Sequence, residues 1–309
     1  WSVPFTEPGL PLNLRSGSYL QLRITLESHS FDDFIRLDSL WIETAPLLAG
    51  DIIGEVALRA DPQPARGFTE VALGREADFV YDLRADFSAA DAPGFDGLRI
   101  RTGSNTRFVG LEMGEPLAPV EPAEVLEEID GLRVRLPTRV NRSDNPPLRL
   151  LFSTTLFSFA TTFSGEVFDS EREVLSQPVV SGDAGQALSS NSLRVLGAAD
   201  AAPGVVQELS LSTPVLTPNG DDVHDRLQIS YTLFRLPEAV PIALTVYALN
   251  GRQLARFDAG LQDAGPREIA WDGRDENGQA LPPGIYLLSI APAAEFATSA
   301  QIRPLGIAY

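Results

Sequence analysis

Apolar and polar residues alternate with a period of two along the last third of the chain, which is the spacing of strands that bury one face. The alternation begins at 227–233 and recurs at 242–247, 268–271, 285–290 and 298–302. Short segments rich in Gly, Pro, Asn and Asp separate these runs, as expected of turns. The pattern therefore predicts an all-β domain at the C-terminal end.

The turns between these runs carry a specific signature. Asn250-Gly251 predicts a two-residue hairpin turn, because both positions of such a turn need positive φ angles. The segments TPNGDDVHDRLQISY, VYALNGR, WDGRDENGQ and PPGIYLL together resemble the immunoglobulin-like domain of the flagellar hook-capping protein, which also closes many secreted bacterial multidomain proteins. The resemblance covers residues 213–309. It implies an immunoglobulin-like sandwich that serves as a spacer, cap or attachment domain, with no catalytic residues to transfer.

The N-terminal end carries two further alternating runs, YLQLRITL at 19–26 and LDSLWIE at 37–43. They resemble the closing strands of a discoidin-like or galactose-binding-like sandwich. Only part of such a domain is present, within residues 1–46. We therefore expect its exposed edges to be covered by the next domain or by another chain.

The middle of the chain continues as strands between turn clusters, with one helical turn expected at 121–129. The expected strands are 52–58, 76–83, 97–102, 106–111, 131–136, 148–159 and 163–168. The Ala-, Pro- and Gly-rich run at 198–204 is the predicted linker. The resulting division is a partial β-sandwich segment at 1–46, a β-sandwich at 47–203 and an immunoglobulin-like domain at 204–309. The predicted fold class is all-β, with tandem β-sandwich (immunoglobulin-like) domains.

The amino-acid composition limits the classes of molecule that this protein is expected to bind. The 309 residues hold 42 acidic and 24 basic residues, all of the latter Arg, for a net charge of −18. Nucleic acid and anionic lipid are disfavoured because both bind basic patches, whereas a neutral or basic protein surface is the easier partner. The absence of Cys excludes disulfides and thiolate metal sites. The absence of Lys beside abundant Ala, Gly, Arg and Asp suggests a bacterium with a GC-rich genome.

No apolar run reaches the roughly 18 residues of a membrane helix, so the chain is not predicted to span a bilayer. It begins at Trp1 without an initiator Met, from which we expect a removed signal segment or a start within a longer chain. A soluble, exported bacterial protein, periplasmic or extracellular, is the predicted class.

The acidic turn at 219–225 is the first candidate site. Asn219, Asp221, Asp222 and Asp225 could offer oxygen ligands to Ca²⁺, which prefers several carboxylates and carbonyls from one loop. The turn lacks the bidentate Glu of an EF-hand, and acidic side chains also suit a turn by bonding their own backbone. Hydrogen bonding within the turn is thus the favoured interpretation, and the same holds for the loop with Asp272, Asp275 and Asn277. No cofactor is predicted.

The sequence contains few candidates for catalytic residues. His29 and His224 fall in different predicted domains, which argues against a catalytic triad or a His-rich metal site. Asp32 and Asp33 could form a carboxylate pair for glycoside hydrolysis, yet nothing places a second carboxylate at the required separation. The sequence therefore predicts a protein that is not an enzyme.

The aromatic residues divide into core and interface candidates. The run with Phe152, Leu156, Phe157, Phe159 and Phe163 is predicted to be core strand, because Ser and Thr intersperse it. Trp41 and Trp271 are predicted to be core because each lies within an alternating strand pattern. The candidates for an interface with another protein are the aromatic and terminal side chains that local strands bury least: Trp1, Phe5, Phe31, Phe34, Ile307 and Tyr309.

These features favour a non-enzymatic structural or accessory subunit outside the cytoplasm that docks on and stabilises a larger envelope assembly. A periplasmic subunit of a bacterial photosynthetic reaction-centre or respiratory membrane complex is one concrete hypothesis. The alternative is a carbohydrate-binding or cell-surface adhesion module, suggested by the galactose-binding-like strands.

Overall fold

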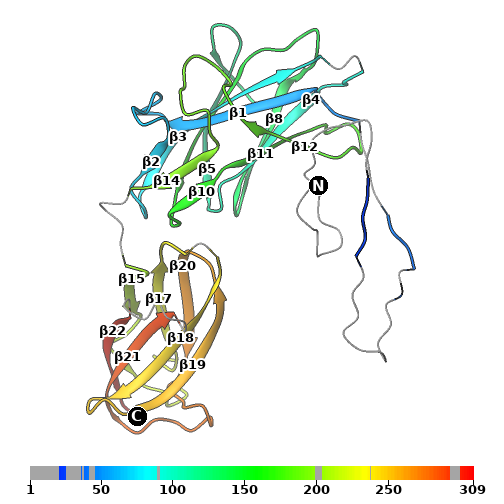
Figure 1. Ribbon diagram of the computed structural model, residues 1–309. Coiled ribbons are helices and arrows are strands. Elements are labelled where there is room, and N and C mark those ends of the chain that lie inside the picture. The colour runs from blue at the N-terminus through cyan, green and yellow to red at the C-terminus, as the bar shows by residue number, and fades with distance from the viewer. Residues whose placement is uncertain are drawn as a thin grey trace.

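The protein is built from strands. The computed structural model describes residues 21–25, 36, 38–41, 46–88, 91–198, 204–236, 238–292 and 300–309. Within these ranges the chain forms strands β1 to β22 and no helix (Figure 1). No described helix could therefore cross a membrane. The predicted all-β class with tandem sandwiches is confirmed.

A first sandwich is formed by residues between 46 and 198. Its six-stranded sheet has the order β13 (Val180–Ser181), β1 (Asp51–Leu58), β3 (Glu76–Asp86), β9 (Leu148–Thr155), β5 (Thr106–Met113), β6 (Ala118–Val120). Its five-stranded sheet has the order β12 (Gln177–Pro178), β11 (Ser164–Phe168), β4 (Phe95–Arg101), β8 (Gly131–Val140), β7 (Glu124–Glu128). A small sheet of β10 (Ala160–Thr162), β14 (Arg194–Gly197) and β2 (Thr69–Val71) lies beside them.

The first core lies between the two large sheets, where one contiguous cluster of buried side chains draws on both. Strand β8 contributes to this core by alternation: Leu132 and Val134 are buried in it, while Arg133 between them is exposed. Phe79 on β3 packs against Phe152 and Phe163, with ring centroids 5.6 and 5.1 Å away. Phe152 and Phe163, both 0% exposed, confirm part of the predicted aromatic core.

The six-stranded sheet is also buried on its outer face. Ala57, Val80 and Leu151 lie side by side on β1, β3 and β9 and pack with Leu188 from the segment 183–192. Because both faces of β3 are covered, its central residues are buried continuously instead of alternately.

A second sandwich is formed by residues 204–309. Its three-stranded sheet has the order β15 (Val206–Leu211), β17 (Leu227–Leu233), β20 (Gly265–Trp271). Its five-stranded sheet has the order β16 (Val215–Leu216), β22 (Gln301–Ile307), β21 (Gly284–Pro292), β18 (Val240–Ala248), β19 (Gln253–Gln262). Ile229, Val246 and Leu288 are fully buried in its separate core, and Trp271, predicted to be core, is 5% exposed in the same cluster.

Several expectations from the sequence are wrong in the described residues. The segment 121–129 is not helical, because Glu124–Glu128 pairs in register with β8 as strand β7. Residues 21–25 and 38–41 form no strand, and Trp41 is 88% exposed instead of buried. The loop at Asn250 has four residues between β18 and β19, and only Gly251 has a positive φ angle, of 83°. Alternation alone does not supply the neighbouring strand that a strand needs for its hydrogen bonds.

The two sandwiches meet at one place. Phe234, directly after β17, is 4% exposed and belongs to the core of the first sandwich, although its sequence neighbours belong to the second. The predicted boundary near 203 falls within 199–203, outside the described residues, and stays a prediction.

Candidate functional site

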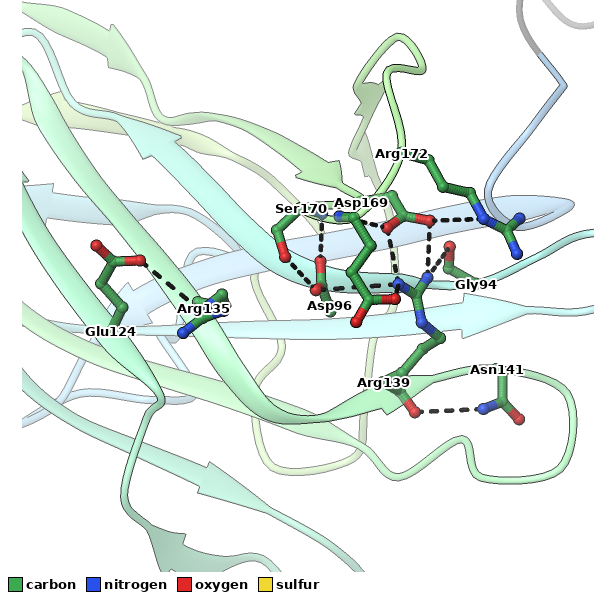
Figure 2. A network of polar contacts seen from close by, with 10 residues as sticks. Gly94, Asp96, Glu124, Arg135, Arg139, Asn141, Asp169, Ser170 and Arg172 are labelled. Atoms are coloured by element: carbon green, nitrogen blue, oxygen red, sulfur yellow. Dashed lines mark hydrogen bonds and ion pairs between the residues drawn. The ribbon is translucent and has the colours of Figure 1, made fainter.

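A cluster of charged and polar side chains lies at one end of the five-stranded sheet of the first sandwich. The Arg139 guanidinium at the end of β8 donates two hydrogen bonds to the Asp169 carboxylate, at 2.8 and 2.7 Å. Figure 2 shows the guanidinium pointing toward this carboxylate, with Asp96 and Ser170 beside it. The Ser170 backbone N–H donates to Asp96 at 2.7 Å, so the acidic groups are bonded within the cluster.

Electrostatics hold this cluster in its charged form. The Asp169 side chain is 0% exposed, and the hydrogen bonds from Arg139 keep the pKa of its carboxyl below the ordinary value of 3.8. The same bonds raise the pKa of Arg139. Because both groups of this pair are ionised and hydrogen-bonded to each other, neither is available as a general acid or base. Its geometry supports a structural role.

A second group of buried charges lies on the outer face of the six-stranded sheet. Glu55 on β1 is 0% exposed, and its carboxylate accepts the backbone N–H groups of Ala184, Gly185 and Asn191 at 3.1, 3.2 and 3.1 Å. Next to it in the sheet, Asp82 accepts two hydrogen bonds from Arg149, at 2.6 and 2.7 Å. Glu55 thereby fastens the covering segment 183–192 to the sheet, whereas Asp82 and Arg149 join two neighbouring strands.

A shallow hollow of about 470 Å³ lies where β5 begins and where β7 and β9 end. Its floor consists of hydroxyl groups that bond one another, such as Thr106 with Thr154 at 3.3 Å. Its rim carries Arg107, Glu127 and the 87% exposed Ile129. One oxygen of Glu127 accepts the Phe108 backbone N–H at 2.9 Å. The hollow offers a mixture of carboxylate, guanidinium and apolar surface to a ligand.

The acidic turn bonds its own backbone. The Asp225 carboxylate accepts the backbone N–H groups of Gly220 and Asp222 at 2.8 and 2.7 Å, and Asp221 accepts that of Val223 at 2.8 Å. Asn219 accepts the Asp221 backbone N–H at 3.1 Å. The hydrogen bonds from Gly220 and Asp222 lower the pKa of Asp225. This geometry matches the interpretation as a self-bonded turn.

The second acidic loop has the same construction. Asp275 accepts the backbone N–H groups of Asn277 and Gln279 at 2.9 and 2.8 Å, and Asp272 accepts that of Arg274 at 3.2 Å. In the part of the chain that the structure describes, no three His, Cys, Asp or Glu side chains gather as a metal site would require.

The interface candidates have different outcomes. Trp1, Phe5, Phe31 and Phe34 lie outside the described residues, and so do Asp32, Asp33 and His29. The prediction of Ile307 as an interface residue is wrong, because its side chain is 3% exposed and packs in the second core, where a partner cannot reach it. Tyr309 is 55% exposed, its hydroxyl donates to the Leu281 carbonyl at 2.7 Å, and it stays a candidate.

The contact between the sandwiches is a feature that the sequence analysis did not predict. Phe157, expected to be core strand, lies instead in the loop after β9, 5.6 Å from the Phe234 ring. Phe159 from the same run is 45% exposed. A signal was present in the sequence, because the adjacent apolar pair Leu233 and Phe234 breaks the period of two at the end of a strand.

Comparison with known proteins places the C-terminal region in a family of domains. Residues 224–295 match the family model of the FlgD Ig-like domain. The resemblance seen in the turn motifs is thereby confirmed for that region. No curated protein matches the sequence. The resemblance of residues 1–46 to a discoidin-like or galactose-binding-like sandwich stays a prediction.

Solved structures match this chain with low TM-scores and low sequence identity. Dimeric latent PorU from Porphyromonas gingivalis aligns with 82% of this chain at 13% identity and a TM-score of 0.29. The adhesin InvE of Yersinia pseudotuberculosis aligns with 83% at 10% identity and 0.24, and the full-length major pilin RrgB from Streptococcus pneumoniae with 83% at 9% identity and 0.28. The chain covers 34%, 59% and 41% of these three proteins. TM-scores of this size do not establish a common fold, so the fold assignment rests on the strand pairing itself.

Proposed function

We propose that this chain is a non-enzymatic structural module of an exported bacterial protein, which holds its C-terminal immunoglobulin-like domain at a larger assembly of the cell envelope. The observation that carries the proposal is that the buried carboxylates of the first sandwich are bonded to arginines or to the backbone. Glu55, Asp82 and Asp169 each have such partners. The match to the FlgD Ig-like domain supports an attachment or spacer role for the other end.

The described residues give little support to an enzyme. A general base or nucleophile needs a neighbour that tunes its pKa and a cavity that admits substrate. Of the two histidines, His224 lies exposed in the acidic turn with a φ angle of 57°. The side chains with lowered carboxyl pKa values, Asp169 and Asp225, are held by hydrogen bonds that keep them ionised.

The partner that fits this surface is a protein with a neutral or basic face. The net charge of −18 favours such a face by long-range attraction. None of the proteins matched above is a subunit of a photosynthetic or respiratory complex, so that narrower hypothesis has no support from them.

Isolation of the native protein from its source in mild detergent tests the proposal. We expect it to migrate with other envelope proteins, well above the mass of its own polypeptide in denaturing electrophoresis, and to dissociate as the salt concentration is raised. Migration as a single species with the mass of one polypeptide under low salt would contradict an assembly role.

The alternative function is carbohydrate binding, and the hollow at Arg107 and Glu127 is the observation that favours it. Its hydroxyl floor, carboxylate rim and exposed Ile129 offer hydrogen bonds beside an apolar contact, as sugar rings require. A glycan array probed with the whole chain tests this alternative. Binding that Glu127→Gln weakens, and that the distant exposed change Glu70→Gln leaves intact, would favour it. Absence of binding to every glycan would remove it.

A further inference from the structure

The joint between the sandwiches is more than a linker. Strand β17 ends at Leu233, which is buried in the second core, and the next residue, Phe234, is buried in the first core. Two consecutive side chains thus belong to two different cores. Since 96% of the Phe234 surface is covered, the second sandwich cannot turn away without exposing this ring to water.

The first sandwich provides a niche that accommodates the ring. Gly74 has a φ angle of +74°, and a Cβ atom added there would lie 2.8 Å from two atoms of the Phe234 ring. Any larger residue would therefore collide with the ring as well as strain the backbone. Phe157 flanks the niche, its ring tilted by 54° against that of Phe234.

Backbone bonds continue the contact on either side of the ring. The Arg235 N–H donates to the Phe157 carbonyl at 2.8 Å, and the Ser158 hydroxyl donates to the Leu236 carbonyl at 3.3 Å. Arg235 adopts a φ angle of +63°, which turns the chain back toward the second sandwich. The Phe234 N–H donates to the Val205 carbonyl at 2.8 Å, which ties the joint to the start of the second sandwich.

We propose that Phe234 and Phe157 form a latch that fixes the direction in which the second sandwich projects from the first and couples the stability of the two. Domains joined by one strand of chain move relative to each other by default. Here the 198–204 connection and the latch are two separate attachments, and two attachments remove most of the freedom to swing. The latch goes beyond the proposed function, because it is required by the geometry of this chain whether or not a partner is found.

Spin labels on the whole chain test the latch directly. The sequence contains no Cys, so Thr138→Cys on the first sandwich and Asn277→Cys on the second, both exposed, provide two unique label sites. We expect a single narrow distance distribution by double electron–electron resonance. Phe234→Ala should broaden it at least twofold. A broad distribution in the parent chain, or an unchanged width in Phe234→Ala, would overturn the latch.

Further variants separate the latch from a general loss of stability. Phe157→Ala removes the same ring contact from the side of the first sandwich, so it should broaden the distance distribution as much as Phe234→Ala does. The double variant Phe157→Ala/Phe234→Ala should broaden it little further. Phe257→Ala is the matched control, because Phe257 packs on Trp271 with centroids 5.9 Å apart, within the second sandwich. It should leave the width unchanged. If Phe257→Ala broadens the distribution as much as Phe234→Ala does, the latch is excluded.

The coupling has its own measurement. In calorimetry Phe234→Ala should lower the melting temperature of the first sandwich by several degrees, although the residue follows a strand of the second. Phe257→Ala should affect the second sandwich alone. If Phe234→Ala fails to fold, Phe234→Leu keeps an apolar side chain and should show the same effects in reduced size. An unaltered first sandwich in both Phe234 variants would contradict the coupling.

Discussion

Arg139 on β8 and Asp169 after β11 meet across the end of β4 as a two-point ion pair, although they are 30 residues apart in the sequence. The Asp169 side chain is fully covered, whereas that of Arg139 is 24% exposed. This asymmetry decides which change is costly, because the carboxylate cannot regain water if its partner is removed.

Replacement of Arg139 by Ala should destabilise the first sandwich by up to about 3 kcal/mol, because the buried Asp169 carboxylate loses two hydrogen bonds and keeps only the more distant ion pair with Arg172, at 3.7 Å. Chemical denaturation measures it. The control is Arg135→Ala on the same strand, whose exposed pair with Glu124 spans 3.7 Å and should cost less than about 0.5 kcal/mol. Equal losses for both would show that Asp169 finds other partners.

The same pair predicts a dependence of stability on pH. The pKa of Asp169 is lowered on folding, so its contribution is complete above the ordinary value of 3.8 and decreases as the pH falls through the lower folded pKa. The free energy of unfolding of the parent chain should therefore fall more steeply below pH 3.8 than that of Arg139→Ala. Parallel curves for the two proteins would argue against this assignment.

Glu55→Gln should loosen the segment 183–192 without unfolding the sheet beneath it. The amide nitrogen that replaces one carboxylate oxygen is a donor and cannot accept an N–H group, while the remaining carbonyl oxygen still accepts. One carboxylate oxygen accepts Ala184 and Gly185 and the other accepts Asn191, so hydrogen exchange should become about tenfold or more faster on the side that loses its acceptor. Glu70→Gln makes the same chemical change at an exposed site and should leave these amides unaffected.

Two tyrosines form a matched pair. The Tyr81 hydroxyl is buried between Gly54 and Gly165 without a hydrogen-bond partner, and burial raises its pKa. Tyr81→Phe should therefore be neutral or stabilising by up to about 1 kcal/mol. The Tyr231 hydroxyl donates to Gln262 at 2.7 Å, so Tyr231→Phe should cost about 1 kcal/mol. Denaturation of both variants measures the difference, and a loss at Tyr81 would reveal a partner such as a bound water.

The acidic turn should be insensitive to calcium. Because Asp225 and Asp221 already accept backbone N–H groups, addition of Ca²⁺ or of a chelator should leave the melting temperature of the chain unchanged. Asp225→Ala should lower the melting temperature of the second sandwich. A rise with Ca²⁺ that Asp225→Ala abolishes would instead establish a cation site there.

Local sequence signals were informative wherever a strand and its turn are adjacent. The alternation at Leu227–Leu233 predicts the buried side of β17, and the Gly-rich turns predict the domain family at 224–295. The Asn250-Gly251 pair predicts the position of the turn correctly but not the length of its loop. The loop length follows from the register of β18 against β19, which shifts at the bulge between Val246 and Tyr247.

Long-range contacts were not predictable in this way. Glu124–Glu128 has a mixed composition compatible with one helical turn, and its conformation follows from pairing with β8. The pattern at 38–41 is that of a strand, but without a paired neighbour among the described residues Trp41 stays exposed.

The all-β class, the acidic and Cys-free character and the immunoglobulin-like C-terminal end follow from the amino-acid sequence, because they depend on composition, on a period of two and on turn residues close together in the chain. The ion pair between Asp169 and Arg139, the hold of Glu55 on a distant segment and the burial of Phe234 in the core of the first sandwich became known from the three-dimensional structure. Each of these depends on which strands pair across long separations, and residues so far apart become neighbours only when the sheets have formed.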